Sequence, residues 1–155
     1  ARARAHLQSK NGKAAEDDLQ AALALTSDKR LRTSILVNLG HNRETNLKDD
    51  AGALAAYRLN FNGKERIGGS EEFRSVQQAA RILSRQGKHD EALQTIARID
   101  AAKQTGSWGA TTHAIQGDIL SAAGRKPAAR AAYQNALAKP GLPKAWREAI
   151  EKKIR

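Results

Sequence analysis

Small and apolar residues recur along the chain at helical spacing. At four places a small residue is followed, four positions later, by a larger apolar one: Ala15 and Leu19, Ala53 and Tyr57, Ala92 and Ile96, and Ala129 and Tyr133. A spacing of four places both members of each pair on one face of a helix. The four alanines are 37 to 39 residues apart. Recurrence over this length is typical of a repeated supersecondary unit.

A second series of small residues precedes the last three of these alanines. Gly40, Ala80 and Gly117 lie 40 and 37 residues apart, each among larger apolar side chains. Gly87 and Gly124 follow two of these helices, and a glycine there supplies the left-handed backbone that ends a helix. Each unit is therefore predicted to be two antiparallel helices joined by a short turn. Such helices approach closely only where one presents a small residue to a bulkier side chain of the other.

The pattern divides the chain into hairpins. We predict the end of a partial repeat over residues 1–27, helical hairpins over 31–61, 71–102 and 108–139, and a capping helix over 143–154. Pro140 and Pro143 cannot extend the preceding helix, so they close the last hairpin. The predicted cap places Trp146, Ala149 and Ile150 on one face and charged residues on the other, as the open end of a repeat stack requires. No methionine occurs, even at position 1, so we expect a fragment of a longer protein.

Six residues of the last hairpin follow a known order: Gly117, Gly124, Ala129, Tyr133, Ala136 and Pro140. They resemble the tetratricopeptide repeat, which has a small residue in its first helix, a glycine at the turn, an alanine, an aromatic and a further alanine in its second helix, and a closing proline. Residues 76–100 match next through QGKHDEAL, and residues 36–60 fit with one extra residue in the turn NLKDD. Sel1-like repeats, which have a longer period, are the closest competitor. Either resemblance implies an all-α fold of antiparallel helical hairpins stacked as a right-handed α-solenoid.

Composition narrows the possible functions. The chain has 27 Lys and Arg against 16 Asp and Glu, a net charge of +11, which rises from +2 over residues 1–50 to +3 over 51–105 and +6 over 106–155. It has no cysteine, which excludes disulfides and thiolate metal sites but leaves open whether the protein is cytoplasmic or exported. No apolar run approaches the roughly 20 residues of a membrane span, so we expect no membrane insertion. The oligomeric state stays open.

Catalytic chemistry has no support in the sequence. An enzyme needs a nucleophile with its base, a metal cluster or paired carboxylates, and the four histidines are scattered one per unit. We therefore expect no catalytic activity, cofactor or metal site. GKERIGGS follows a predicted helix and lacks the Lys-Ser/Thr of a phosphate loop, which favours a linker. The acidic runs at 16–18 and 48–50 lack the spacing of a calcium loop and suit helix starts.

The first helices hold the candidate binding surface. In the family that the chain resembles, first helices line a concave groove, and projection onto this sequence gives seven candidate ligand-binding residues: Asn38, His41, Arg74, Gln77, Gln78, Arg81 and Arg85. Asp118 lies on the same predicted face of the next first helix. Arginine pairs with carboxylates in bidentate fashion, so an acidic or hydroxyl-rich ligand suits this face. A looser version of the family's clamp for a C-terminal carboxylate runs through Arg2, His6, Asn38, Arg74 and Gln78.

Three functions follow from these observations. The first is a non-enzymatic scaffold that binds a peptide or protein partner, acidic or otherwise, in the concave groove. The second is a basic solenoid that binds a polyanion, either nucleic acid or an acidic polysaccharide, because Lys and Arg neutralise its charges and release counterions. The absence of aromatic residues among the predicted exposed cations weakens this alternative. The third is a solenoid domain that serves an enzyme elsewhere in a longer chain.

Overall fold

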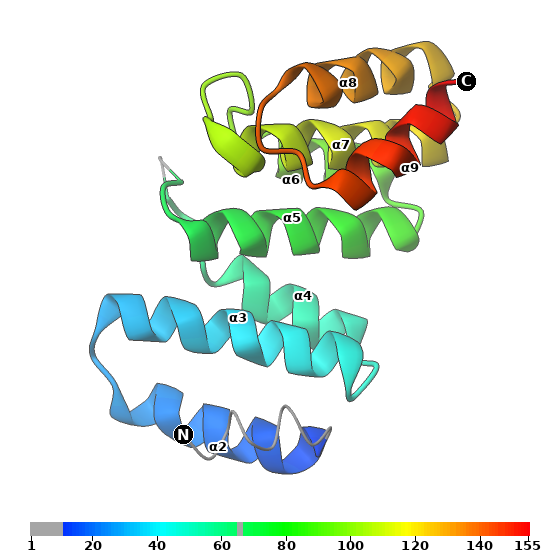
Figure 1. Ribbon diagram of the computed structural model, residues 1–155. Helices are drawn as coiled ribbons and strands as arrows, with labels where there is room; N and C mark the ends of the chain where they lie inside the picture. Colours follow the sequence, from blue (N-terminus) through cyan, green and yellow to red (C-terminus); the bar gives the residue numbers. More distant parts are fainter. Residues whose placement is uncertain (1–10, 65–66) are drawn as a thin grey trace. The chain divides into compact units, whose positions relative to one another are not determined.

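The computed structural model describes residues 11–64 and 67–155, and every regular element in these ranges is an α-helix (Figure 1). The eight helices are α2 (Gly12–Leu25), α3 (Lys29–Thr45), α4 (Asp50–Arg58), α5 (Ser70–Arg85), α6 (His89–Ile96), α7 (Gly106–Ala122), α8 (Lys126–Ala138) and α9 (Lys144–Ile154). The chain divides into two compact units, Ala1–Ala79 and Ala80–Arg155, so α5 begins in the first and ends in the second. The predicted all-α class is confirmed.

Short polar side chains begin the helices of the first unit. The Asp28 carboxylate accepts hydrogen bonds from the backbone N–H groups of Arg30 and Leu31, at 2.8 and 3.0 Å, and so caps α3. Asp49 caps α4 by accepting from the N–H of Gly52 at 2.8 Å. These side chains satisfy backbone donors that have no partner within the helix. The acidic run at 48–50 therefore has a structural role at a helix start.

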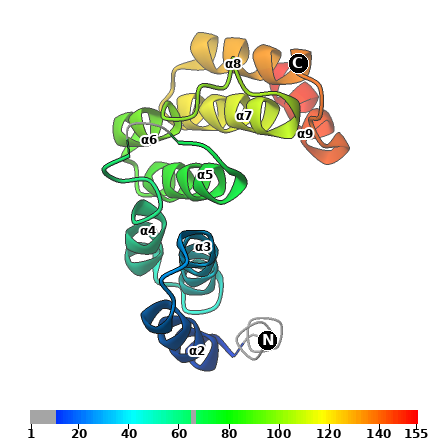
Figure 2. The ribbon, with the colours of Figure 1, turned by 90° about the vertical axis from the view of Figure 1, so that its left-hand side faces the viewer.

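The hairpin of α3 and α4 in the first unit is held by a small residue opposite an aromatic ring. The two helices run antiparallel, and α2 packs against α3 (Figures 1 and 2). A Cβ added at Gly40 of α3 would lie 2.5 Å from the Tyr57 ring of α4. Since no side chain fits in that space, glycine is required there for the ring to pack. The predicted pairing of a small residue with a larger one is confirmed in this hairpin.

The second unit repeats this packing between α7 and α8. A Cβ added at Gly117 of α7 would lie 2.5 Å from the Tyr133 ring of α8. Helix α9 packs on this pair through Ile150, which is buried in a core with Ala114 and Ala129 (Figure 2). The four periodic alanines of the sequence pattern are all buried, with Ala15, Ala53 and Ala92 fully so. The period of about 38 residues therefore marks core positions.

The turns inside the hairpins differ between the units. In the second unit Gly87 and Gly124 adopt positive φ angles of 77° and 74°, as predicted for glycines that end a helix. Each turn has the same pair of backbone bonds, such as Gly124 N–H to Ser121 O and Arg125 N–H to Leu120 O. In the first unit the corresponding residue is Lys48, with a φ of 57°. A lysine pays a steric cost in this conformation that glycine does not.

Candidate functional site

The first candidate site is a cleft of ≈280 Å³ within the first unit. It is lined by Val37, Asn38 and His41 of α3, Tyr57 of α4, and Arg74 and Gln78 of α5. Spacings of three and four residues put Asn38 with His41, and Arg74 with Gln78, on one face of their helices. Their amide, imidazole and guanidinium groups offer hydrogen-bond donors to one small space. This arrangement suits an acidic or hydroxyl-bearing group.

Two contacts fix the polar edge of this cleft. The Tyr57 hydroxyl donates a hydrogen bond to Oε2 of Glu44 at 3.3 Å, while the ring is buried against Gly40. Arg74 Nη1 lies 3.8 Å from Oε2 of Glu71, one turn earlier on α5. The Arg74 side chain remains about half exposed, so this pair contributes little stability and leaves the guanidinium accessible.

The second candidate site is a cleft of ≈380 Å³ within the second unit. It lies between the C-terminal part of α5 and α7 and is lined by Arg81, Ser84, Arg85, Ile115, Asp118, Ile119 and Ala122. Ile115 and Ile119 are each 1% exposed and form an apolar floor. Charged side chains from both helices therefore surround a dry base, which suits a ligand with both apolar and acidic parts.

Helix α9 contributes two contacts beside this second cleft. The guanidinium carbon of Arg81 lies 5.0 Å from the ring centroid of Trp146, within the range of a cation–π interaction. Lys153 Nζ lies 2.6 Å from Oδ1 of Asp118, which also accepts a 2.7 Å hydrogen bond from the Tyr133 hydroxyl. Burial, and then the bond to the Asp118 carboxylate, raise the pKa of Tyr133. Asp118 is thus paired with Lys153 and Tyr133, although Asp118 and Arg85 are both exposed.

The predicted site residues fall into three groups. Asn38, His41, Arg74 and Gln78 lie together in the first cleft, and Arg81 and Arg85 line the second. The expectation that Gln77 is exposed was wrong, because its residue is only 9% exposed. Gln77 lies four residues after the buried Phe73, which places it toward the inward-facing side of α5. Arg2 and His6 of the looser clamp lie outside the described residues.

Several lining residues were not predicted from the sequence. Tyr57 was recognised as a core residue, and its position on the cleft wall follows only from the packing of α3 on α4. Ile115 and Ile119 were also apolar positions without a predicted site role. Trp146 was placed on the inner face of the last helix, but nothing in its spacing indicates Arg81 as a neighbour.

Each of the two acidic runs includes a residue with a partner within the protein. Glu16 binds Arg43, and Asp49 caps α4. Among residues 11–64 and 67–155 no three histidine or acidic side chains lie together in a way that could hold a metal ion. No helix within these ranges has the length and apolar character needed to cross a membrane. The sequence GKERIGGS includes positions 65–66, which are outside the described residues.

The fold and the two clefts define the class as a helical-hairpin repeat protein. A family model described as a tetratricopeptide repeat-like domain matches residues 50–155, from α4 to the last helix, so the chain belongs to this family. The predicted resemblance is confirmed. Repeats of this kind commonly mediate protein interactions and are generally non-catalytic. Neither a curated protein nor a solved structure gives a match.

Proposed function

We propose that the protein is a non-enzymatic scaffold that binds a protein or peptide partner through the clefts of its first helices. The observation that supports this most strongly is the first cleft, where Asn38 and His41 of α3 meet Arg74 and Gln78 of α5. All four are polar, and each was expected at a binding surface from the family resemblance projected onto the first helices. The second cleft, with Arg81 and Arg85, is a separate contact.

The partner of these clefts carries acidic groups. The first cleft offers the donors of an arginine and two amides, and among the described residues the acidic contact of Arg74 is the weak one with Glu71. A carboxylate of the partner would therefore replace a long, exposed pair with a bidentate one. In the second cleft the apolar floor of Ile115 and Ile119 favours a peptide with an aliphatic residue beside its acidic one.

Photo-crosslinking tests which surface the partner occupies. A photoreactive residue is placed at Gln78, in the first cleft, and in a matched variant at Gln134, which is exposed on α8. In a lysate of the source cells we expect a discrete crosslinked product from position 78, and its loss in the additional variant Arg74→Glu. Equal products from both positions, or a product from position 134 alone, would contradict the proposal.

A polyanion is the second candidate ligand, because charge is concentrated in one part of the chain. Residues 80–155 contain 14 Lys and Arg against six Asp and Glu, a net charge of +8 out of +11. Lys126 and Arg130 are exposed on α8 and make no ion pair with the described residues. Together with Lys152 on α9 they could neutralise phosphate or sulfate groups.

Salt dependence distinguishes this candidate from a protein partner. We expect heparin and DNA to bind weakly at low salt and to dissociate near physiological salt, since nonspecific ionic contacts weaken steeply with salt. Arg130→Glu should reduce that binding, whereas Arg74→Glu should not. Binding that persists at about 0.15 M salt with micromolar affinity would favour the polyanion over the protein partner.

A further inference from the structure

The first unit has another cleft, on the side of α2 and α4. Its volume is ≈380 Å³, and its lining includes Leu36 and Leu39 of α3, Leu23 of α2, and Ala56 and Leu59 of α4. Leu36 and Leu39 lie on a different face of α3 from Asn38 and His41, as their helical spacing requires. This surface, the α2–α4 cleft, is therefore separate from the first candidate site.

One apolar side chain at this cleft is unusually accessible. Leu59 at the end of α4 is 67% exposed and Leu23 of α2 is half-buried, whereas Leu36 and Leu39 are buried and form the floor of the cleft. In residues 80–155 no large apolar side chain is exposed to a comparable degree. Burial of an exposed leucine is favourable, so Leu59 offers binding energy to a partner.

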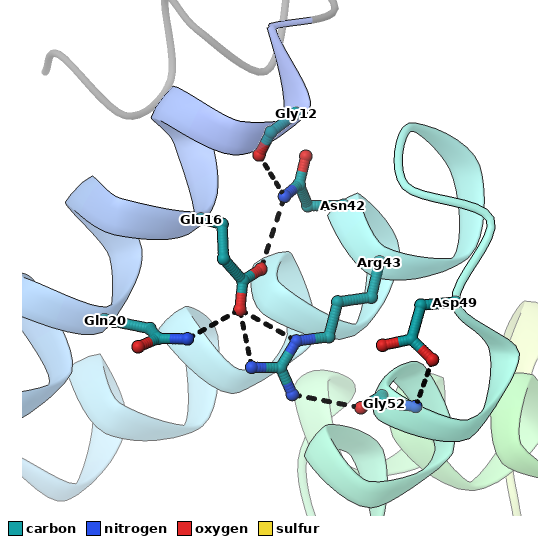
Figure 3. A network of polar contacts seen from close by, with 7 residues as sticks. All are labelled: Gly12, Glu16, Gln20, Asn42, Arg43, Asp49 and Gly52. Atoms are coloured by element: carbon teal, nitrogen blue, oxygen red, sulfur yellow. Dashed lines mark hydrogen bonds and ion pairs between the residues drawn. The ribbon is translucent and has the colours of Figure 1, made fainter.

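An arginine lies at one end of the cleft, and its guanidinium group is occupied by hydrogen bonds within the protein. Arg43 donates from Nε to Oε1 of Glu16 at 2.9 Å and from Nη1 to the carbonyl of Gly52 at 3.1 Å (Figure 3). Gln20 and Asn42 also donate to the Glu16 carboxylate, at 2.8 and 3.4 Å. The charge of Glu16 is thus neutralised within the protein, and it does not repel an acidic ligand.

The arginine at the other end of the cleft is held by hydrogen bonds, but two of its nitrogen donors make no hydrogen bond with the described residues. Arg32 Nη1 donates to the carbonyls of Leu23 and Thr26, at 2.9 and 3.1 Å, at the end of α2. Its Nε and Nη2 make no hydrogen bond with the described residues, and the side chain is exposed. These two nitrogens form the edge of a guanidinium that binds a carboxylate in bidentate fashion.

We propose that the α2–α4 cleft binds an amphipathic helix of a partner protein, with a carboxylate at the end that meets Arg32. Arg32 and Arg43 are 11 residues apart on α3, so the cleft spans about 16 Å, or three turns of a ligand helix. Leucines on one face of that helix pack mainly on Leu59 and Leu23, above the buried floor of Leu36 and Leu39. Among the described lining residues, the charge that remains available is that of Arg32, which is positive and selects an acidic end.

A labelled peptide tests this proposal with the intact chain. The probe is a fluorescein-labelled helical peptide of about 14 residues, with leucines at i, i+3 and i+7 and one glutamate in its first turn. We expect fluorescence anisotropy to give a Kd below about 100 μM. Leu59→Arg should weaken binding at least about tenfold. Arg32→Glu should weaken it similarly, and a peptide with lysine in place of the glutamate should restore binding to that variant.

Three controls keep the outcomes distinct. Leu47→Arg changes an exposed leucine outside the cleft and should leave binding unchanged. Arg74→Glu, in the first candidate site, should also leave it unchanged, so this proposal and the proposed function can fail separately. A scrambled peptide should bind far more weakly. No binding at about 1 mM peptide, or equal loss in Leu59→Arg and Leu47→Arg, would overturn the proposal.

Discussion

The two units share one arrangement of core packing but differ in their surfaces. Gly40 lies against Tyr57 in the first unit as Gly117 lies against Tyr133 in the second, and a Cβ added at either glycine would lie 2.5 Å from the ring. Each tyrosine hydroxyl then donates to a carboxylate of the first helix. One internal arrangement thus supports two hairpins, and the functional differences between them lie on their surfaces.

The surfaces differ in apolar exposure and in charge. The large apolar side chains that are exposed in the described chain are Leu25, Leu31, Leu47 and Leu59, all in the first unit. Residues 80–155 carry +8 of the net charge of +11. The first unit is therefore better suited to apolar docking, and the second to ionic contacts. The same repeat can serve both uses because its core does not constrain its outward-facing positions.

The largest expected effect comes from filling the space beside a tyrosine. Gly117→Leu and Gly40→Leu should each destabilise the protein by about 3 kcal/mol, because the new side chain overlaps the ring. Urea unfolding of the intact chain measures the change. Ala138→Leu, at an exposed position of α8, should change stability by less than about 0.5 kcal/mol. Equal losses in the α8 control and the glycine variants would contradict the predicted packing.

A smaller loss of stability is expected when the ion pair between Glu16 and Arg43 in the first unit is removed. Glu16→Gln should cost about 1–3 kcal/mol at neutral pH, because it weakens charged hydrogen bonds to a partly buried group. Burial alone would raise the pKa of Glu16, but the bonds from Arg43 and Gln20, the charge of Arg43 and the bond from Asn42 hold it below its usual range. A carboxylate whose pKa is lowered by folding stabilises the folded state at pH values above its pKa in the unfolded chain. This contribution is lost as the pH falls through its pKa in the folded state.

The pH dependence provides the measurement for this pair. The stability difference between wild type and Glu16→Gln should be full at neutral pH, decrease below about pH 4.5 and be absent once Glu16 is protonated in both states. Asp17→Asn is the matched control, since Asp17 is exposed and makes no ion pair with the described residues. A difference that is independent of pH would show that the charge of Glu16 is not responsible.

The hairpin turns should show an effect of about 1 kcal/mol with opposite signs in the two units. Lys48→Gly should raise stability by up to about 1 kcal/mol, because Lys48 adopts a φ of 57°. Gly124→Ala should lower stability by about 1 kcal/mol for the same reason, although nothing lies within 4 Å of its added Cβ. Thermal unfolding of both variants checks this. A loss of stability in Lys48→Gly would mean that the lysine side chain contributes more than its backbone strain costs.

The smallest effect is expected at the exposed ion pair of the second unit. Arg125 Nη2 lies 2.6 Å from Oδ1 of Asp90, but both side chains are largely exposed. Asp90→Asn should therefore cost no more than about 0.5 kcal/mol, and less in high salt. Chemical unfolding at low and high salt measures it. A cost equal to that of Glu16→Gln would contradict the difference in burial between the two pairs.

The sequence predicts those parts of the fold that repeat locally. Gly117 and Tyr133 were recognised because small and aromatic residues recur at helical spacing, and this pattern depends only on the geometry of a helix. Arg74 and Gln78 were grouped correctly on one face for the same reason. The burial of Gln77 and the contact between Arg81 and Trp146 involve residues that are distant in the sequence or that face the interior of the fold. Tertiary packing decides such contacts, and the spacing of residues along one helix carries no information about that packing.

The central claim, that the first cleft binds the partner, is tested most directly by charge reversal in and away from that cleft. The partner identified by crosslinking is titrated calorimetrically with wild type, Arg74→Glu and Arg130→Glu. We predict that Arg74→Glu weakens binding at least about tenfold, because it replaces an attractive contact with a repulsive one. Arg130→Glu should change the affinity by less than about threefold. Unchanged binding by Arg74→Glu, together with a large loss in Arg130→Glu, would contradict the account.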